Sequence, residues 1–321
     1  MFAGHMRTKD PNGFILAEIL ISLLIFIVIT AAILTTLKLS TEKITSFLDY
    51  RKAAVRIAKA NALIKSPVFY CGYGMPVAGG SYKKAFGGQK FDPFRWDGPI
   101  SAYSGPSGLI NSELRITYAM PGSVRLSEMT VSHEDENLIR LDRFPEQGSI
   151  GDSFAGCSYD IRNWVLFSSS FPPALPFCIT GAYGKTLMIK NNFTTSFSLS
   201  KGDRMHHLRA LKLYCLNDTL FTRDFRASGD QPRVTGIRDI RFDVDIPARK
   251  LTVYVLARGD HIYGQKRPII GAGSWPKEYI EPWIKKETKY QLYASKTIWR
   301  LQNCVGSDLI DLETTSVREH F

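Results

Sequence analysis

Apolar residues dominate one long run near the beginning of the chain. From Phe14 to Leu37 the sequence has 24 residues with a single charged side chain, Glu18. A helix of this length extends about 36 Å, at roughly 1.5 Å per residue, whereas the hydrocarbon core of a bilayer is about 30 Å thick. The pattern therefore predicts a membrane-spanning helix at 14–37, preceded by a polar leader at 1–13.

The helical pattern continues beyond this run with a different spacing of apolar residues. From Thr41 to about Lys65 they recur three and four positions apart, and charged residues fall mostly between them. This spacing predicts an amphipathic helix at 38–66 with one face to bury. Ser66 and Pro67 are expected to end it, because proline lacks a backbone N–H and disfavours the helical conformation of the residue before it.

The rest of the chain is predicted to be a loop region followed by strands. Gly, Pro and aromatic residues are frequent at 67–113, which predicts loops. In the following domain, 114–321, Ile240 and Phe242 alternate with Arg241 and Asp243, as on a strand with one buried face. The expected fold is α+β, a long N-terminal helix packed on an antiparallel β-sheet. Strands are predicted at 114–119, 124–131, 138–144, 164–169, 186–190, 194–199, 208–216, 219–225, 237–245, 250–257 and 290–301.

The beginning of the apolar run carries a recognisable signal. In NGFILAEILI, Gly13 precedes Phe14, and Glu18 is the fifth residue after the glycine. This resembles the class III signal of type IV pilins and type II secretion pseudopilins. The resemblance implies that a prepilin peptidase cleaves between Gly13 and Phe14 and methylates the new amine of Phe14. It also implies a pilin-like fold, in which Glu18 pairs with the Phe14 amine of a neighbouring subunit.

Glu18 has two other interpretations, which the residues leave open. A carboxylate at the centre of a spanning helix costs about 2.5–3.5 kcal/mol and less near the interface, so a partner is expected. Because Glu18 lies four residues after Phe14, it could reach the terminus of its own chain on the same helix face. It could also be an interfacial residue of an ordinary membrane anchor.

Four segments of the C-terminal half resemble PilW-type minor pilins in their order. They are YCLNDTLFTRDF, VTGIRDIRFDVD, KLTVYVLARGD and KYQLYASKTIWRLQNC. The resemblance implies a subunit that initiates or caps pilus assembly, together with other minor pilins, the major pilin and the inner-membrane assembly platform. J-type pseudopilins of type II secretion have a related layout and are the alternative within this class.

The same resemblance implies a location. The chain would cross the inner membrane once, with the C-terminal domain in the periplasm, and would reach the pilus or cell surface after assembly. A count of positive charges argues for the opposite orientation, since Arg7 and Lys9 precede the span whereas Lys38, Lys43 and Arg51 follow it. We give the signal precedence, because long domains translocate largely regardless of such charges.

The basic composition permits an anionic partner without naming one. Lys and Arg exceed Asp and Glu by 41 to 30. This net charge alone suggests a subunit of a DNA-uptake pilus as a further alternative. Separately, aromatic residues with Lys83, Lys84, Lys90 and Arg95 in the loop region suggest a nucleic-acid surface. A loop whose aromatic residues fold back on the core is the preferred interpretation, so nucleic acid is an unfavoured partner.

The cysteines and the remaining polar residues predict no catalytic or metal site. Five cysteines can form at most two disulfides, in any of 15 arrangements, and buried free thiols are the alternative. No CxxC motif and no zinc-like spacing of His and Cys occurs, so we expect neither metal nor cofactor. No cluster of acid, base and nucleophile is evident, and a membrane-anchored surface enzyme is the alternative from a different class. The cysteines are Cys71, Cys157, Cys178, Cys215 and Cys304.

Overall fold

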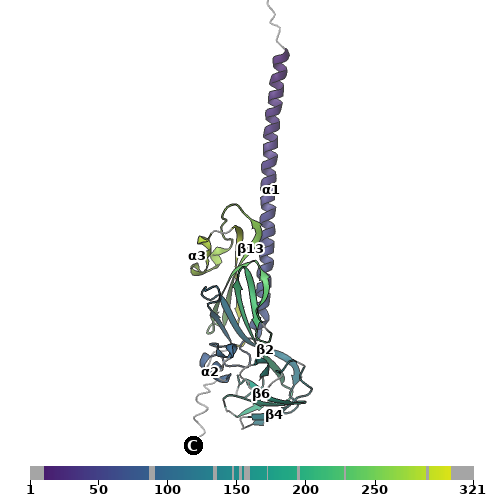
Figure 1. Ribbon diagram of the computed structural model, residues 1–321, viewed down its shortest axis with the longest axis vertical. Helices are drawn as coiled ribbons and strands as arrows, with labels where there is room; N and C mark the ends of the chain where they lie inside the picture. Colours follow the sequence, from purple (N-terminus) through teal and green to yellow (C-terminus); the bar gives the residue numbers. More distant parts are fainter. Residues whose placement is uncertain are drawn as a thin grey trace, which may run out of the picture. The chain divides into compact units, whose positions relative to one another are not determined.

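The structure is a computed structural model in which two compact units are distinguished. It describes residues 11–86, 91–132, 136–146, 148–151, 154, 160–171, 173–193, 196–227, 229–286 and 289–304, with side chains from Leu16 onward except that of Ala17. The units are Met1–Arg51 and Lys52–Phe321. Helix α1 (Pro11–Tyr70) supplies the helical residues of the first unit and the first element of the second (Figure 1).

The second unit is built on antiparallel sheets. The largest sheet has the order β1-β2-β9-β5-β6-β7-β4, with β10 paired to β9 and β11 to β10. A second sheet has the order β12-β13-β14, and β3 pairs with β8. The strands are β1 (Ile100–Tyr103), β2 (Glu113–Arg125), β3 (Thr130–Ser132), β4 (Glu136–Arg140), β5 (Trp164–Phe167), β6 (Phe177–Tyr183), β7 (Thr186–Lys190), β8 (Phe197–Leu199), β9 (Arg204–Leu216), β10 (Thr219–Asp224), β11 (Gln231–Thr235), β12 (Ile237–Asp245), β13 (Lys250–Ile262) and β14 (Tyr290–Arg300).

The part of α1 that follows Arg51 packs on these sheets. Ala53, Ala60, Ile64 and Val68 belong to one buried cluster with apolar residues of β2, β9, β12 and β13. The two alanines allow the helix backbone to come close to the strands, and the larger residues fill the core. The α+β fold and the antiparallel sheet predicted from the sequence are therefore confirmed.

Helix α1 ends four residues later than the sequence suggests. Pro67 lies inside the helix, which continues to Tyr70. In the last turn a proline removes only one intrahelical hydrogen bond. Ile64 and Val68 are buried on either side of it, at 0% and 2% exposure. Their burial favours the helical conformation and offsets the lost bond.

The region predicted as loops at 67–113 contains regular secondary structure, and several of its aromatic side chains are buried in the core. It contains helix α2 (Gly79–Ala85), a short 3-10 helix (Asp92–Arg95) and strand β1. Phe86 and Phe94 stack at 4.9 Å between ring centroids, and Trp164 of β5 packs against both. The preferred interpretation, that these aromatic residues belong to the core, is confirmed for Tyr82, Phe86, Phe94 and Trp96.

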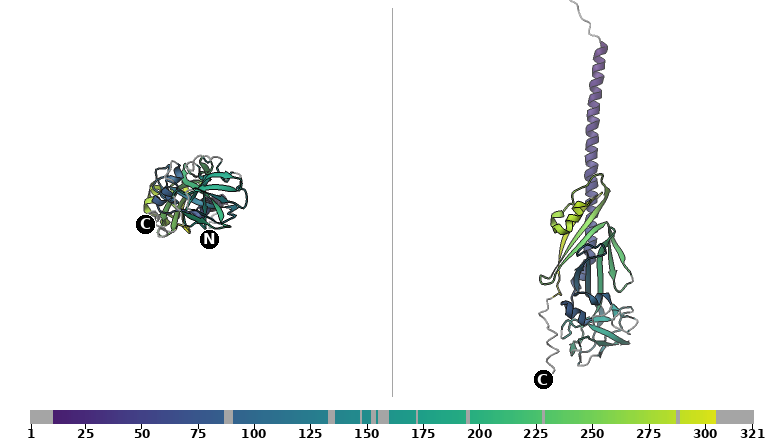
Figure 2. Two further views of the ribbon diagram at one scale, coloured as in Figure 1. Left: turned by 90° about the horizontal axis from the view of Figure 1, so that it is seen from below. Right: turned by 60° about the vertical axis from the view of Figure 1, so that its left-hand side comes forward.

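Helix α3 (Lys277–Lys285) covers one face of the three-stranded sheet. Tyr279 and Ile280 of α3 are buried in a cluster with Tyr254 and Leu256 of β13 and Leu292 of β14. Within the second unit, α3 and β13 lie toward one end, and β4 and β6 lie toward the other, in both side views (Figures 1 and 2).

Candidate functional site

The first unit presents apolar side chains on every side of α1. The most hydrophobic 18-residue window has a mean hydropathy of 2.8, and none of it is buried. Phe26, for example, is 69% exposed. A helix that buries one stripe in a protein core is apolar on that stripe only. Apolar side chains all round indicate lipid or other apolar helices as the natural surroundings, and α1 is long and apolar enough to cross a membrane.

Two hydroxyls of this apolar segment, and one that follows it, form hydrogen bonds within the helix. The hydroxyls of Thr35, Thr36 and Thr41 donate to carbonyls four residues earlier, at 2.8, 2.9 and 2.8 Å. Such bonds remove unsatisfied donors from an apolar environment. The Glu18 carboxylate differs, because it is exposed and makes no hydrogen bond or ion pair with any other described residue.

The predicted processing site lies at the start of this helix. Gly13 and Phe14 are within α1, but their side chains fall outside the described part of the structure. Cleavage after Gly13, methylation of Phe14 and pairing of Glu18 with an amine therefore stay predictions.

In the second unit, two basic residues of α1 bind one carboxylate of β13. Arg56 donates to Asp260 at 2.6 Å and, through its other terminal nitrogen, to the carbonyl of Arg258 at 2.6 Å. Lys52 also donates to Asp260. The pKa of the Asp260 carboxyl falls to about 2, first because of the hydrogen bond from Lys52 and then because of that from Arg56. The Asp260 carboxylate is thus already engaged within the chain.

This ion pair continues into a chain of alternating charges. Arg258 lies 3.3 Å from the carboxylate of Asp218, in the β9–β10 turn, and Asp218 in turn binds Arg238 of β12. Charges in such a network hold one another at fixed positions. The network therefore connects α1, β13, β12 and the β9–β10 turn around the apolar core.

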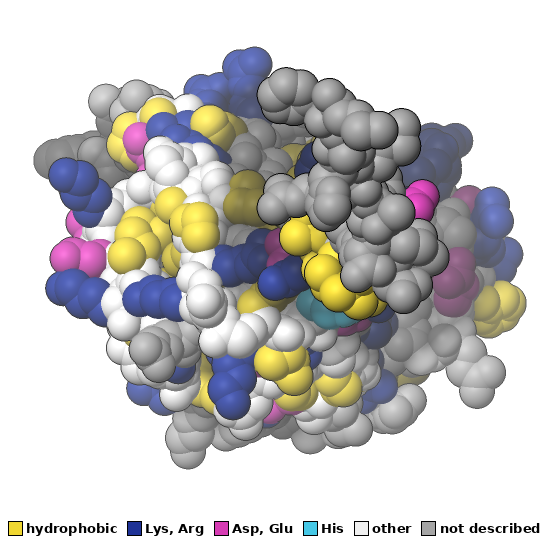
Figure 3. Space-filling model, turned by 90° about the horizontal axis from the view of Figure 1, so that it is seen from above, with side chains coloured by type: hydrophobic (Ala, Val, Ile, Leu, Met, Phe, Trp, Pro, Cys, Tyr) yellow, Lys and Arg dark blue, Asp and Glu magenta, His cyan; other side chains and the backbone are white. Residues whose placement is uncertain are grey.

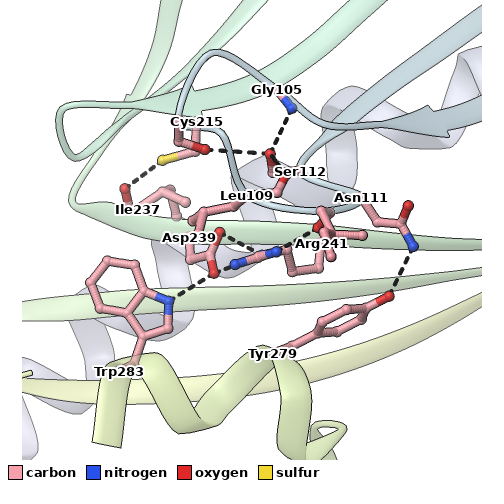
Figure 4. A network of polar contacts seen from close by, with 12 residues as sticks. Gly105, Leu109, Asn111, Ser112, Cys215, Ile237, Asp239, Arg241, Tyr279 and Trp283 are labelled. Atoms are coloured by element: carbon pink, nitrogen blue, oxygen red, sulfur yellow. Dashed lines mark hydrogen bonds and ion pairs between the residues drawn. The ribbon is translucent and has the colours of Figure 1, made fainter. Parts of the chain in front are cut away.

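A second polar network lies between β12 and helix α3 (Figure 4). Asp239 and Arg241 of β12 are 2% and 3% exposed, and the Arg241 Nε lies 2.9 Å from Asp239 Oδ2. The Trp283 indole donates to the same oxygen at 2.8 Å. Burial raises the pKa of Asp239, and the nearby Arg241 opposes this shift. Asn111 donates to the Tyr279 hydroxyl at 2.9 Å, so two aromatic residues attach α3 to its neighbours.

The sequence placed one member of this network on the correct face of its strand but did not reveal what covers that face. Arg241 was predicted to face away from Ile240 and Phe242 on β12, and it does. The two apolar residues are fully buried as expected, but helix α3, which the sequence pattern did not reveal, covers the other face and buries Arg241. Aromatic residues at 279 and 283, one helical turn apart, were the available signal.

A cavity of about 730 Å³ lies beside the second network. The Cys215 thiol at its wall donates to the carbonyl of Ile237 at 2.9 Å, and burial raises its pKa to about 12. A thiol with this pKa is protonated at neutral pH and is a poor nucleophile. The Asp239 oxygens are engaged by Arg241 and Trp283. The lining comprises Ser107, Leu109, Cys215, Leu216, Asn217, Asp218, Arg238, Asp239, Pro282, Trp283 and Lys286.

The cysteines divide into bonded and unbonded groups. Cys178 is disulfide-bonded, and Cys157 lies outside the described residues. Cys71, Cys215 and Cys304 are buried thiols. The Sγ atoms of Cys71 and Cys304 are 3.7 Å apart. Sequence alone left all pairings open, and the fold brings two of the predicted cysteines together.

The basic residues do not gather on the face shown in Figure 3, where they lie in separate places among apolar and neutral side chains. Two residues suggested for phosphate contacts interact with other side chains of the chain. Lys83 forms an ion pair with Asp97 at 2.6 Å, and the Lys84 amine lies over the Phe193 ring, 5.8 Å from its centroid. Lys90 falls outside the described residues.

Among the described residues, no three His, Cys, Asp or Glu side chains gather to hold a metal ion. That the chain needs no metal stays a prediction.

No protein-family model, curated protein or solved structure matches the chain. The family resemblance therefore depends on the residues of the chain and on its fold. The fold has a long apolar N-terminal helix, and the part of that helix from Lys52 onward packs on an antiparallel sheet. This is a pilin-like architecture.

Proposed function

We propose that the chain is a minor type IV pilin of the PilW type. It is anchored in the inner membrane by residues 14–37, is processed by prepilin peptidase, and takes part in initiating or capping a pilus. The observation that carries this proposal is the division of α1 into two different parts. One is apolar on all sides, and the other, from Lys52, is built into the core of a folded domain.

The apolar part supports a role in assembly as well as anchoring. A membrane anchor needs only enough apolar residues to span, and a carboxylate such as Glu18 weakens it. In a filament, the same helix would be covered by helices of other subunits, and Glu18 would neutralise the methylated amine of Phe14. The filament therefore gives a reason for both the apolar surface and the unpaired charge.

The folded part supports assembly and binding over catalysis. The charged residues described above connect elements of the domain to one another: Lys52 and Arg56 to β13, and Asp239 to α3. Cys215, the one cysteine in the lining of the cavity, is a protonated thiol. Such a domain is suited to presenting a rigid surface to other pilins, held at the membrane by α1.

Copurification of the full chain, tagged at its C-terminus, tests this proposal. In a host with both a type IV pilus and a type II secretion system, the protein should be extracted from inner membranes with other minor pilins. Copurification with secretion pseudopilins alone would contradict the pilus assignment. Failure to copurify with either class, while the chain is still membrane-bound, would contradict any role in filament assembly.

A further inference from the structure

Two buried thiols face each other at the end of α1 and just after the end of β14. Cys71 follows the final helical residue, Tyr70, and Cys304 lies four residues after Arg300 of β14. Both side chains are fully buried, and their Sγ atoms are 3.7 Å apart. Within the described residues, the third free thiol, Cys215, instead donates to the carbonyl of Ile237.

The backbone around this pair is shaped to accommodate it. Gly72 has φ +75°, and a Cβ atom there would lie 2.9 Å from Cys304 Sγ and 3.0 Å from the carbonyl oxygen of Asn303. A side chain at this position would displace the second thiol. The absence of one allows the segment after β14 to lie directly against the end of α1.

Other residues hold the same segment in place independently of the thiols. The Asn303 amide donates to the carbonyl of Phe69 at 2.8 Å, and the Leu301 N–H donates to the carbonyl of Arg249 at 2.9 Å. Leu301 is fully buried. Because these contacts fix both backbones, forming an S–S bond of about 2.05 Å requires the two sulfurs to approach by less than 2 Å, without moving either element as a whole.

We propose that Cys71 and Cys304 form a disulfide in the exported, mature protein. Two S–H bonds break and one S–S bond forms, while two electrons and two protons pass to the disulfide of a thiol oxidant, which becomes two thiols. The closed site excludes solvent, so the exchange occurs during folding, before Leu301 and Asn303 take their final positions. In one respect the inference rests on the proposed function, since the domain must reach an oxidising compartment.

The bond would enclose the whole β-domain in one covalent loop. Residues 72–303 all lie between the two cysteines. A force applied between α1 and the chain beyond Cys304 would then pass through the S–S bond and not through the hydrogen bonds of the sheets. A subunit held in a filament by its helix would thereby keep its domain folded under tension.

Peptide mapping of the full chain tests the inference directly. The protein is extracted from membranes in detergent, denatured with N-ethylmaleimide present, and digested with trypsin without reduction. We expect peptide 66–83 linked to peptide 301–318, and the maleimide on Cys215. The inference is overturned if Cys71 and Cys304 both carry the maleimide and also remain unlinked after the purified chain is unfolded and then incubated with oxidised glutathione while it refolds.

The same incubation distinguishes this inference from the proposed function. Linkage by glutathione together with free thiols in the protein from cells would support the pairing and overturn the proposed export of the domain. As a second measurement, Cys71→Ser and Cys304→Ser should each lower the unfolding temperature by roughly 5–15 °C without reductant. Reductant, which also acts on the disulfide of Cys178, should lower the unfolding temperature of the wild type and of the control Cys215→Ser further than that of Cys71→Ser or Cys304→Ser. An equal response of all four proteins to reductant would overturn the inference.

Discussion

The guanidinium of Arg56 on α1 lies against the backbone of Gly236, where a Cβ atom would come within 2.5 Å of Arg56 Cζ. Gly236 has φ +81° and connects β11 to β12. The same guanidinium binds Asp260 and the carbonyl of Arg258. The absence of a side chain at position 236 thus lets an arginine of the helix reach β13.

Gly236→Ala should therefore destabilise the domain for two reasons. A positive φ costs a non-glycine residue about 1–2 kcal/mol, and the new methyl group would also displace Arg56. Gly202→Ala is the matched control, because Gly202 has the same φ with no atom within 4 Å of the added Cβ. Urea unfolding should show a larger loss for Gly236→Ala, and equal losses would mean that the Arg56 contact contributes nothing.

Acid should weaken the attachment of α1 to β13. The folded-state pKa of Asp260 is about 2, below its ordinary value of about 3.9. A depressed carboxyl pKa contributes stability above pH 4, and this contribution is lost as the pH falls from about 4 toward 2. The stability difference between wild type and Asp260→Asn should shrink over that range and be smaller in high salt, since the side chain is 37% exposed. A difference that is constant with pH would contradict the assignment.

Asp239→Ala should be much more damaging than the loss of a surface ion pair. It leaves Arg241 buried without its carboxylate and removes the acceptor of the Trp283 indole, at an expected cost of about 3–5 kcal/mol. Glu281→Ala, which breaks the exposed pair with Lys285 on the same helix, should cost less than about 1 kcal/mol. Comparable denaturation midpoints for the two variants would show that α3 is not held by this network.

The sequence identified those elements in which apolar residues recur at a regular spacing. The apolar run predicted α1, and the alternation around Ile240 predicted β12 with its bounds. Strand β6 was missed because Gly181 and a register shift next to it interrupt the alternation. Helix α3 was missed because Pro282 lies inside it and no side chain caps its start, so its stability comes from burial against β13.

The contacts of the candidate sites depend on residues far apart in the chain. Arg56 and Asp260 are 204 positions apart, and Cys71 and Cys304 are 233 apart. No local spacing could indicate either pair. Gly13, Phe14 and Glu18 could be proposed as a site from the sequence because their signal is contained in six residues.

Glu18→Val tests the role of the single charge in the span. Membrane insertion and cleavage should continue, because the apolar run becomes longer and the cleavage site is unchanged. Incorporation should fail, since an unpaired buried amine costs about 3–5 kcal/mol. Glu18→Asp keeps the charge with a shorter reach and should be intermediate. Incorporation is measured by copurification with minor pilins, and a Glu18→Val protein that copurifies as well as the wild type would mean that the pairing role is wrong.

The mass of the N-terminal peptide tests the central claim most directly. The full chain is coexpressed with a prepilin peptidase, extracted from membranes and analysed by mass spectrometry, with a peptidase-free culture as the control. The account predicts that Met1–Gly13 is removed and that the new first residue is Phe14 with a methylated amine, only when the peptidase is present. A chain that keeps its leader, or begins at another residue, under these conditions would contradict the claim that α1 is the assembly helix of a pilin.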